Sequence, residues 1–233
     1  MACGENYRDY QCDKCGNLHR VPILCKKRTC QKCAGIKSRN LIKSYLPIIE
    51  SFEFPCLVTL TLRNVSYMDV EEELNRIVLS FCKLRRREVW KGEKGIYAIE
   101  IVKKGGKSWY VHIHALIDSK WMNKNALSDT WFNITGDSFV VDIRTIKGEK
   151  KKALREVLKY QTKMWELNDD DKEFVDMIFK GRRFIGSFGI QKPEKEKPIP
   201  MKCKCGGNLM PLEDPYFKGG GRKNWGDLYR DSS

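Results

Sequence analysis

Two cysteine pairs with the same spacing constrain this chain more than any other sequence feature. Cys12 and Cys15 are separated by two residues, Cys30 and Cys33 repeat that spacing, and 14 residues lie between the pairs. Paired CxxC knuckles at about this distance bind zinc tetrahedrally, and four thiolates leave no open position on the ion. We therefore expect a small N-terminal ribbon with structural zinc held by Cys12, Cys15, Cys30 and Cys33.

Further cysteines can complete or extend this metal binding. Cys25 and His19 lie in the loop between the two pairs, and either can replace one ligand. Cys203 and Cys205, followed by two glycines, resemble another zinc knuckle. This knuckle has no partner pair in the sequence, so Cys3, Cys25 or another free cysteine can join it in a second site.

The ten cysteines are not expected to form a disulfide framework. Residues 1–9 are polar and lack the apolar core of a signal peptide, and the chain has no run of 18 apolar residues. We therefore expect a cytoplasmic protein with no membrane partner, whose thiols stay reduced.

The charge balance favours a polyanionic partner. Lys and Arg number 44 against 30 Asp and Glu, which gives a formal net charge of +14. Such an excess produces a positive field that attracts nucleic acid, although a basic solvated surface has the same composition. Basic residues also alternate with aromatic ones, as in single-stranded DNA grooves. The alternative is a solvated basic face together with aromatic residues of the core. The basic runs are residues 85–87 and 147–152, and the aromatic residues are Trp90, Trp109, Tyr110 and Trp131.

Three stretches of the chain differ in character. Residues 1–40 hold six of the ten cysteines, residues 41–190 alternate between strand-like and helix-like patterns, and residues 191–233 begin with a Pro- and Lys-rich run. We interpret them as a zinc-binding cysteine cluster, a main domain, and a linker with a tail.

The main domain is expected to be α+β, with a central antiparallel sheet and helices on one face. Its antiparallel element is a hairpin whose strands meet at Lys104-Gly-Gly-Lys107. Periodicity predicts strands over residues 57–62, 96–103, 108–118 and 139–146, and helices over residues 69–89, 123–132, 149–165 and 172–179.

Two histidines form a potential metal site on one of these strands. His112 and His114 alternate with apolar residues, so both imidazoles point to the same face. Counted back from the hairpin turn, Glu100 falls opposite residue 111 or 112, and only the second register places its carboxylate beside the histidines. Two imidazoles and a carboxylate can hold a divalent ion with open positions. The alternative is a pair of ordinary histidines on a wet face.

A tyrosine lies on the helix predicted over residues 149–165. Glu156, Tyr160 and Lys163 are spaced i, i+4 and i+7, so they share one helix face. A tyrosine hydroxyl has a pKa of about 10, and a neighbouring lysine with a metal-bound phosphate would favour its phenolate. The alternative is an amphipathic helix with a charged exposed face.

Together these elements resemble the HUH endonuclease superfamily, and especially the rolling-circle plasmid replication initiators. Residues 57–64 (LVTLTLRN) look like the first motif, a threonine-rich strand. His112-Ile-His114 matches the second motif, and residues 156–163 (EVLKYQTK) match the third. Residues 25–33 (CKKRTCQKC) are similar to the cysteine cluster that precedes the first motif in many of these proteins.

The resemblance implies a metal-dependent DNA endonuclease and strand transferase with an HUH/RRM-like palm over residues 41–190. It implies that His112 and His114, with Glu100, hold Mg²⁺ or Mn²⁺. Tyr160 would attack the scissile phosphate, giving a 5′-phosphotyrosine link and a free 3′-OH. Lys163 would orient the phosphate or phenolate, and Glu156 would activate water for termination.

The partners implied are single-stranded or hairpin DNA at a replication origin and the host replication machinery. A transposase or relaxase of the same superfamily would share the chemistry and differ in its DNA site. Two further alternatives are a non-catalytic zinc-ribbon protein that binds nucleic acid and a metal hydrolase that works without tyrosine.

Overall fold

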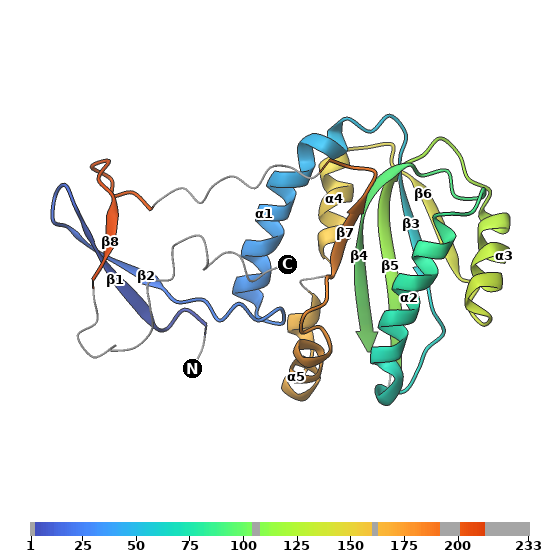
Figure 1. The fold of residues 1–233 in the computed structure, drawn as a ribbon, viewed down its shortest axis with the longest axis horizontal. Helices are drawn as coiled ribbons and strands as arrows, with labels where there is room; N and C mark the ends of the chain where they lie inside the picture. Colours follow the sequence, from blue (N-terminus) through green and yellow to red (C-terminus); the bar gives the residue numbers. More distant parts are fainter. Residues whose placement is uncertain (1–2, 104–107, 160–162, 192–200, 213–233) are drawn as a thin grey trace.

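The computed structural model describes residues 3–103, 108–159, 163–191 and 201–212 (Figure 1). It contains two antiparallel sheets, one of three strands and one of five. Figure 1 shows the smaller sheet at one end of the molecule, beyond helix α1, and the larger sheet with its helices at the other end. Within these described ranges, no helix is long and apolar enough to cross a membrane.

The larger sheet confirms the expected antiparallel architecture. Its strand order is β6-β3-β5-β4-β7, so β5 is central. Every pair of neighbouring strands is antiparallel. The hairpin predicted around Lys104–Lys107 is the β4–β5 pair. The strands are β3 (Pro55–Thr61), β4 (Lys94–Lys103), β5 (Trp109–Asp118), β6 (Val141–Thr145) and β7 (Ile185–Phe188).

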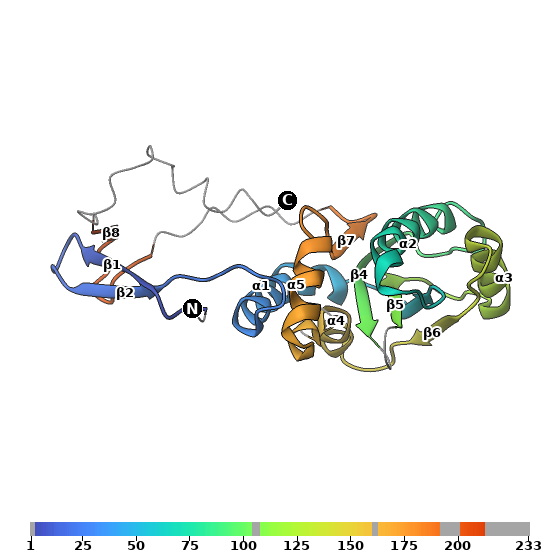
Figure 2. The same ribbon diagram turned by 90° about the horizontal axis from the view of Figure 1, so that it is seen from below.

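Two helices, α2 (Val70–Leu84) and α3 (Lys124–Thr135), cover one face of this sheet (Figure 2). Three glutamates in the first turn of α2 favour its start, because their charge opposes the helix dipole. The helix then buries an apolar stripe at helical spacing against alternate strand residues such as Leu60 and Ile113. The α+β class and the helical cover of one face are thus confirmed.

Helices α1 (Gln31–Glu50) and α4 (Lys150–Lys159) pack together against the opposite face. Their apolar residues form a second core with strand residues that include Ala98 and Leu116. Leu116 belongs to the same strand face as His112 and His114, because side chains alternate along β5. The histidines therefore lie on the face that carries α4.

The chain beyond α4 returns to the first core. The 3-10 helix η2 (Lys163–Glu166) replaces the last turn of the helix expected through residue 165. Helix α5 (Asp169–Ile178) follows, capped by the Asn168 side chain, and its carboxylate at Asp171 pairs with Lys103 of β4 at 2.7 Å. Buried Met164 of η2 and the apolar side of α5 belong to the core of the α2 face.

The smaller sheet joins both ends of the described chain. Its order is β2-β1-β8, formed by β1 (Tyr7–Cys12), β2 (Leu18–Pro22) and β8 (Leu209–Pro211). Strand β8 comes from the stretch expected to be a linker and tail, and it pairs antiparallel with the end of β1. The N-terminal ribbon is therefore completed by residues nearly 200 positions away.

We expect the central strand to be the most sensitive part of the fold. Ile113 is 0% exposed between α2 and the sheet, so Ile113→Ala should lower the free energy of unfolding by about 2–5 kcal/mol through lost burial and a residual cavity. Urea denaturation followed by circular dichroism measures this loss. Leu79→Ala is the control, because Leu79 of α2 is 62% exposed and its loss should cost less than about 0.5 kcal/mol. Equal losses in both variants would contradict the assigned core.

Candidate active site and cysteine clusters

Three adjacent strands place the candidate ligands in one row. In the β3–β5–β4 register, His112 lies between Thr61 and Glu100, and His114 lies between Thr59 and Ala98. Of the two registers open from the sequence, the structure has the one that brings Glu100 to the histidine face. The row thus gathers two imidazoles, two hydroxyls and one carboxylate on a rigid sheet.

The contacts within this row fix the imidazole rings. The Nε2 atom of His114 lies 2.8 Å from an Oε atom of Glu100, and both residues are buried. The Nδ1 atoms of His112 and His114 lie 2.9 and 3.1 Å from the hydroxyls of Thr61 and Thr59. When Nδ1–H of His112 donates to Thr61, the His112 Nε2 lone pair is available to a ligand, whereas Nε2 of His114 faces the Glu100 carboxylate. The threonine-rich strand was expected from the sequence, but these two hydroxyls were assigned no role.

Burial keeps the His112 imidazole uncharged. Loss of hydration lowers the pKa of His112 from its ordinary 6.5 to about 4, against the opposing effect of the Glu100 carboxylate. The ring of Tyr110 stacks parallel to that of His112 at 6.2 Å between centroids. Neutral imidazole is the form that binds a metal ion, so the ring is ready to act as a ligand at neutral pH.

The side chains of the row are of the kinds that bind a divalent cation. Their ligand atoms, however, are farther apart than in the cysteine clusters. Among the described residues, groups of three or more potential ligand atoms lying within 4.8 Å of one another are formed by cysteines alone. The rings of His112 and His114 are 6.0 Å apart and inclined by 34°. His114 and Glu100 are therefore already in contact, and His112 lies next to them without its ligand atom reaching the same point.

The tyrosine motif is only partly described. Tyr160 lies outside the described residues, one position after the end of α4. Lys163 is seen as the first residue of η2, and its side chain also lies outside the described part. Glu156 accepts a hydrogen bond from Arg144 of β6 at 2.6 Å. Helix α4, which carries the first residues of the motif, packs on the histidine face.

The aromatic residues expected to contact DNA are mostly core residues. Trp90, Trp109 and Trp131 are at most 7% exposed, and the Trp131 indole donates to a backbone carbonyl of β3. Arg85 lies over the rings of two core phenylalanines, whereas Arg86 and Arg87 are exposed. Burial removes the three tryptophans from any stacking surface, whereas the Arg86 and Arg87 side chains stay available.

The cysteines form two clusters, each able to hold a metal ion. Contrary to the expected single site, Cys12 and Cys15 are not grouped with Cys30 and Cys33. The reason is the hairpin: the first pair lies at its turn and the second follows its base, and a ladder of five residue pairs separates them by about 15 Å. The two clusters are Cys3, Cys25, Cys30 and Cys33, and Cys12, Cys15, Cys203 and Cys205.

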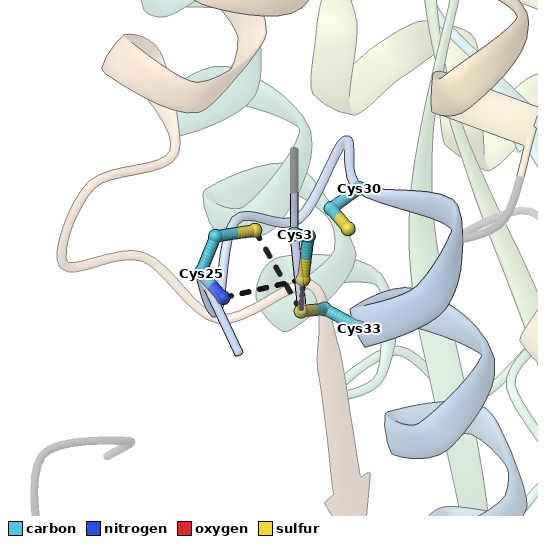
Figure 3. Close-up of side chains that lie close together, drawn as sticks. All are labelled: Cys3, Cys25, Cys30 and Cys33. Carbon is cyan, nitrogen blue, oxygen red and sulfur yellow. Dashed lines mark hydrogen bonds between the residues drawn. The ribbon is translucent and has the colours of Figure 1, made fainter. Parts of the chain in front are cut away.

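The first cluster joins the N-terminal end to the start of α1 (Figure 3). The Sγ atom of Cys33 lies 3.4 Å from that of Cys3 and 3.7 Å from that of Cys25. The backbone N–H of Cys25 donates to Cys3 Sγ at 3.3 Å, and this bond lowers the pKa of the Cys3 thiol to about 7. Cys3 and Cys25 were candidates to join Cys203 and Cys205, but the structure groups them with Cys30 and Cys33 instead.

The loop of the first cluster is anchored on α5. The Asp176 carboxylate accepts hydrogen bonds from the backbone N–H groups of Arg28 and Thr29 and from the Thr29 hydroxyl, the last at 2.6 Å. The Arg28 guanidinium donates to the carbonyl of Arg182 and lies 4.5 Å from the ring centre of Phe184. The loop between Cys25 and Cys30 therefore contacts the segment that follows the tyrosine motif.

Comparison with known proteins identifies relatives over most of the chain. A family model described as "Rep_1: Replication protein" matches residues 17–216. A "Protein rep" of Staphylococcus aureus is 31% identical over 159 residues, covering 60% of this chain and 69% of that protein. A "Protein rep" of Streptococcus pneumoniae serotype 2 is 24% identical over 249 residues, covering 91% of this chain and 75% of that protein. No solved structure matches the chain.

The lowered pKa of His112 predicts a loss of stability in acid. The unfolded imidazole gains its proton near pH 6.5 and the folded one only near pH 4, so stability falls as the pH drops through that window. Between pH 7.5 and 4.5 this group should remove roughly 2.5 kcal/mol from the free energy of unfolding. Urea denaturation in buffer without Mg²⁺ or Mn²⁺ should show a smaller loss for His112→Gln than for the parent. Equal losses would show that His112 titrates normally.

Proposed function

The chain belongs to the replication protein family Rep_1, and from this premise we propose that it nicks and joins single-stranded DNA at a replication origin. The reaction would start rolling-circle replication of a plasmid and would proceed through a 5′-phosphotyrosine intermediate. The observation that carries this proposal is the row of His112, His114 and Glu100, held on the hydrogen-bonded strands β5 and β4 beside α4.

The row supplies ligands suited to Mg²⁺ or Mn²⁺. Imidazole with carboxylate suits Mn²⁺ well, and three protein ligands would leave positions for phosphate oxygens. The hydroxyls of Thr59 and Thr61 orient the rings from behind, as outer partners of ligating histidines commonly do. When bound, such an ion would polarise the scissile phosphate.

Tyr160 is the proposed nucleophile. Its phenol oxygen would form a bond to phosphorus while the bond from phosphorus to the 3′ oxygen breaks, and the phenol proton would leave so that a 3′-OH results. The DNA 5′ phosphate would then be joined to the protein, and the 3′-OH would prime synthesis. Support comes from the position of Tyr160 directly after α4, which packs on the histidine face.

Two further residues of α4 and η2 have proposed roles. Lys163 would orient or neutralise the phosphate or the phenolate. Glu156 would accept a proton from the water that releases the DNA at termination. Glu156 is held by Arg144 at 2.6 Å at a partly exposed position, so water can reach it when this ion pair opens.

The first cysteine cluster is proposed to hold structural zinc. Its ligands would be Cys3, Cys25, Cys30 and Cys33, a set of four thiols that closes the coordination sphere of the ion. The ion would fix the loop that reaches α5 through Asp176. It would thereby stabilise the segment following the tyrosine without taking part in the chemistry.

The expected partners are single-stranded or hairpin DNA at the origin and the host replication machinery, encountered in the cytoplasm. The net charge of +14 supports attraction to DNA. Exposed Arg86 and Arg87 at the end of α2 are candidates for phosphate contacts.

Covalent capture of DNA tests the nucleophile. Mixed with Mn²⁺ and labelled single-stranded oligonucleotides tiled over the native replicon, the protein should give a band that resists denaturation on a gel. Tyr160→Phe should abolish this adduct, because it removes the attacking oxygen. Tyr7→Phe is the control, since Tyr7 is 52% exposed on the ribbon. An adduct formed by Tyr160→Phe would exclude this assignment, and cleavage without any adduct would indicate a water-using hydrolase.

Metal affinity tests the third ligand. Glu100→Ala should weaken Mn²⁺ binding, measured by isothermal titration calorimetry, by about 10-fold or more. Glu93→Ala, at an exposed position just before β4, should leave the affinity unchanged. If both variants bind Mn²⁺ as the parent does, the third ligand lies elsewhere.

Metal content tests the first cluster. Elemental analysis of the variant combining Cys30→Ser with Cys33→Ser should show one zinc ion fewer per chain than the parent. Cys82→Ser, on α2 outside both clusters, should retain the parent content. Unchanged zinc in the double variant would rule out the site.

A further inference from the structure

The second cysteine cluster is formed by two knuckles from opposite ends of the described chain. We propose that Cys12, Cys15, Cys203 and Cys205 bind a zinc ion of their own, and that this ion clasps residues 201–212 onto the N-terminal hairpin. The site is separate from the proposed nicking chemistry and from the first cluster. With this ion bound, the three-stranded sheet is a module whose closure depends mostly on the metal.

The distances between the thiols suit zinc and exclude disulfides. The Sγ atom of Cys12 lies 3.4 Å from that of Cys205, and that of Cys15 lies 3.6 Å from that of Cys203. All four cysteines are free, and their Sγ atoms lie within 4.8 Å of one another. A disulfide would require about 2.05 Å. A tetrahedral zinc ion with Zn–S bonds of about 2.3 Å separates its sulfurs by about 3.8 Å.

Both knuckles have the backbone of a metal-binding turn. In the first, the N–H of Lys14 donates to Cys12 Sγ at 3.4 Å, and Gly16 closes the turn with φ of +72°. In the second, the N–H of Gly206 donates to the Cys203 carbonyl at 2.9 Å, and Gly206 has φ of +86°. Only glycine adopts these angles readily. The amide donor aimed at the Cys12 sulfur favours its thiolate, which is the form that binds metal.

The two knuckles fit each other closely. A Cβ atom at position 207 would lie 2.5 Å from Cys12 Sγ, so only glycine allows the second knuckle to approach the first. The Asp13 carboxylate accepts hydrogen bonds from the backbone and side-chain amides of Asn208, at 2.8 and 3.0 Å. The imidazole Nε2 of His19 lies 3.2 Å from Cys203 Sγ and orients that ligand from outside the cluster.

The ribbon lacks a core that can hold it together without metal. Its strands are three to six residues long, and an isolated sheet of this size is marginal in water. Its buried apolar side chains within the described ranges are Tyr10, Cys12 and Cys203, and two of these three are proposed ligands. The free energy of metal binding therefore has to supply most of the closure.

The clasp can be tested on the full chain by cutting it beside the knuckle. A protease recognition sequence is placed between Gln191 and Met201, so that cleavage breaks the chain on the N-terminal side of the second knuckle. After cleavage, the C-terminal fragment separates from the main part unless non-covalent contacts or a metal ion hold it. With zinc present, the cut fragment should elute with the main part on gel filtration. After removal of zinc by a chelator, it should elute alone without denaturant. A fragment that stays attached in chelator would overturn the proposal, as would iron in place of zinc in elemental analysis.

Matched variants separate this site from the first cluster. Cys203→Ser with Cys205→Ser should contain one zinc ion fewer per chain than the parent and release the cut fragment even in zinc. Cys30→Ser with Cys33→Ser should keep the fragment attached. In the variant that combines Cys30→Ser with Cys33→Ser, Co²⁺ bound at the second cluster should still give the absorption of a four-thiolate tetrahedral site. Unchanged zinc content in Cys203→Ser with Cys205→Ser would overturn the proposal.

The nicking reaction provides an independent check that the clasp variant is folded. Cys203→Ser with Cys205→Ser should still form the covalent adduct on a short oligonucleotide, because the histidine row lies on the five-stranded sheet. Adduct formation by this variant also shows that its main domain has folded. Loss of the clasp with the adduct intact supports the proposal, whereas fragment retention by a nicking-competent variant excludes it.

Discussion

The hydrogen-bonded register of β3, β5 and β4 is the constraint on which the candidate site depends. It sets His112 between Thr61 and Glu100, and a slip of one residue in β4 would turn that carboxylate into the apolar core. Ile99 and Ile101, the neighbours of Glu100, are buried on the α2 face and hold the register in place. The buried core of one face therefore determines the chemistry of the other.

The same logic explains what the sequence could predict. Alternation and helical periodicity are local signals, so they gave the α+β class, the β4–β5 hairpin and the shared face of His112 and His114. Hairpin counting reduced the position of Glu100 to two registers, and only packing of the whole strand selects one. The extent of the tyrosine helix depended on tertiary contacts, because η2 turns towards the other core.

The grouping of the cysteines could not be predicted because it is set by contacts between distant residues. Spacing suggested one site from two neighbouring CxxC pairs, but the geometry of a short hairpin keeps those pairs apart. Cys30 and Cys33 instead meet Cys3 and Cys25, and Cys12 and Cys15 meet the knuckle of Cys203 and Cys205, whose partner pair was left open by the sequence. The tryptophans show a related limit, since composition cannot distinguish a stacking surface from a core.

The pairing of β8 with β1 sets an order of events during synthesis of the protein. The N-terminal hairpin leaves the ribosome first, but its sheet lacks an edge strand and two cysteines until the C-terminal knuckle has been made. At about 5–20 residues per second, the roughly 190 residues between Cys15 and Cys205 take about 10–40 s to translate. During that interval the main domain can fold. The N-terminal hairpin meanwhile carries the Cys12 and Cys15 thiols without the other two cysteines of their cluster. Of the two described sheets, the ribbon is thus the last to be completed, although its hairpin is made before the five-stranded sheet.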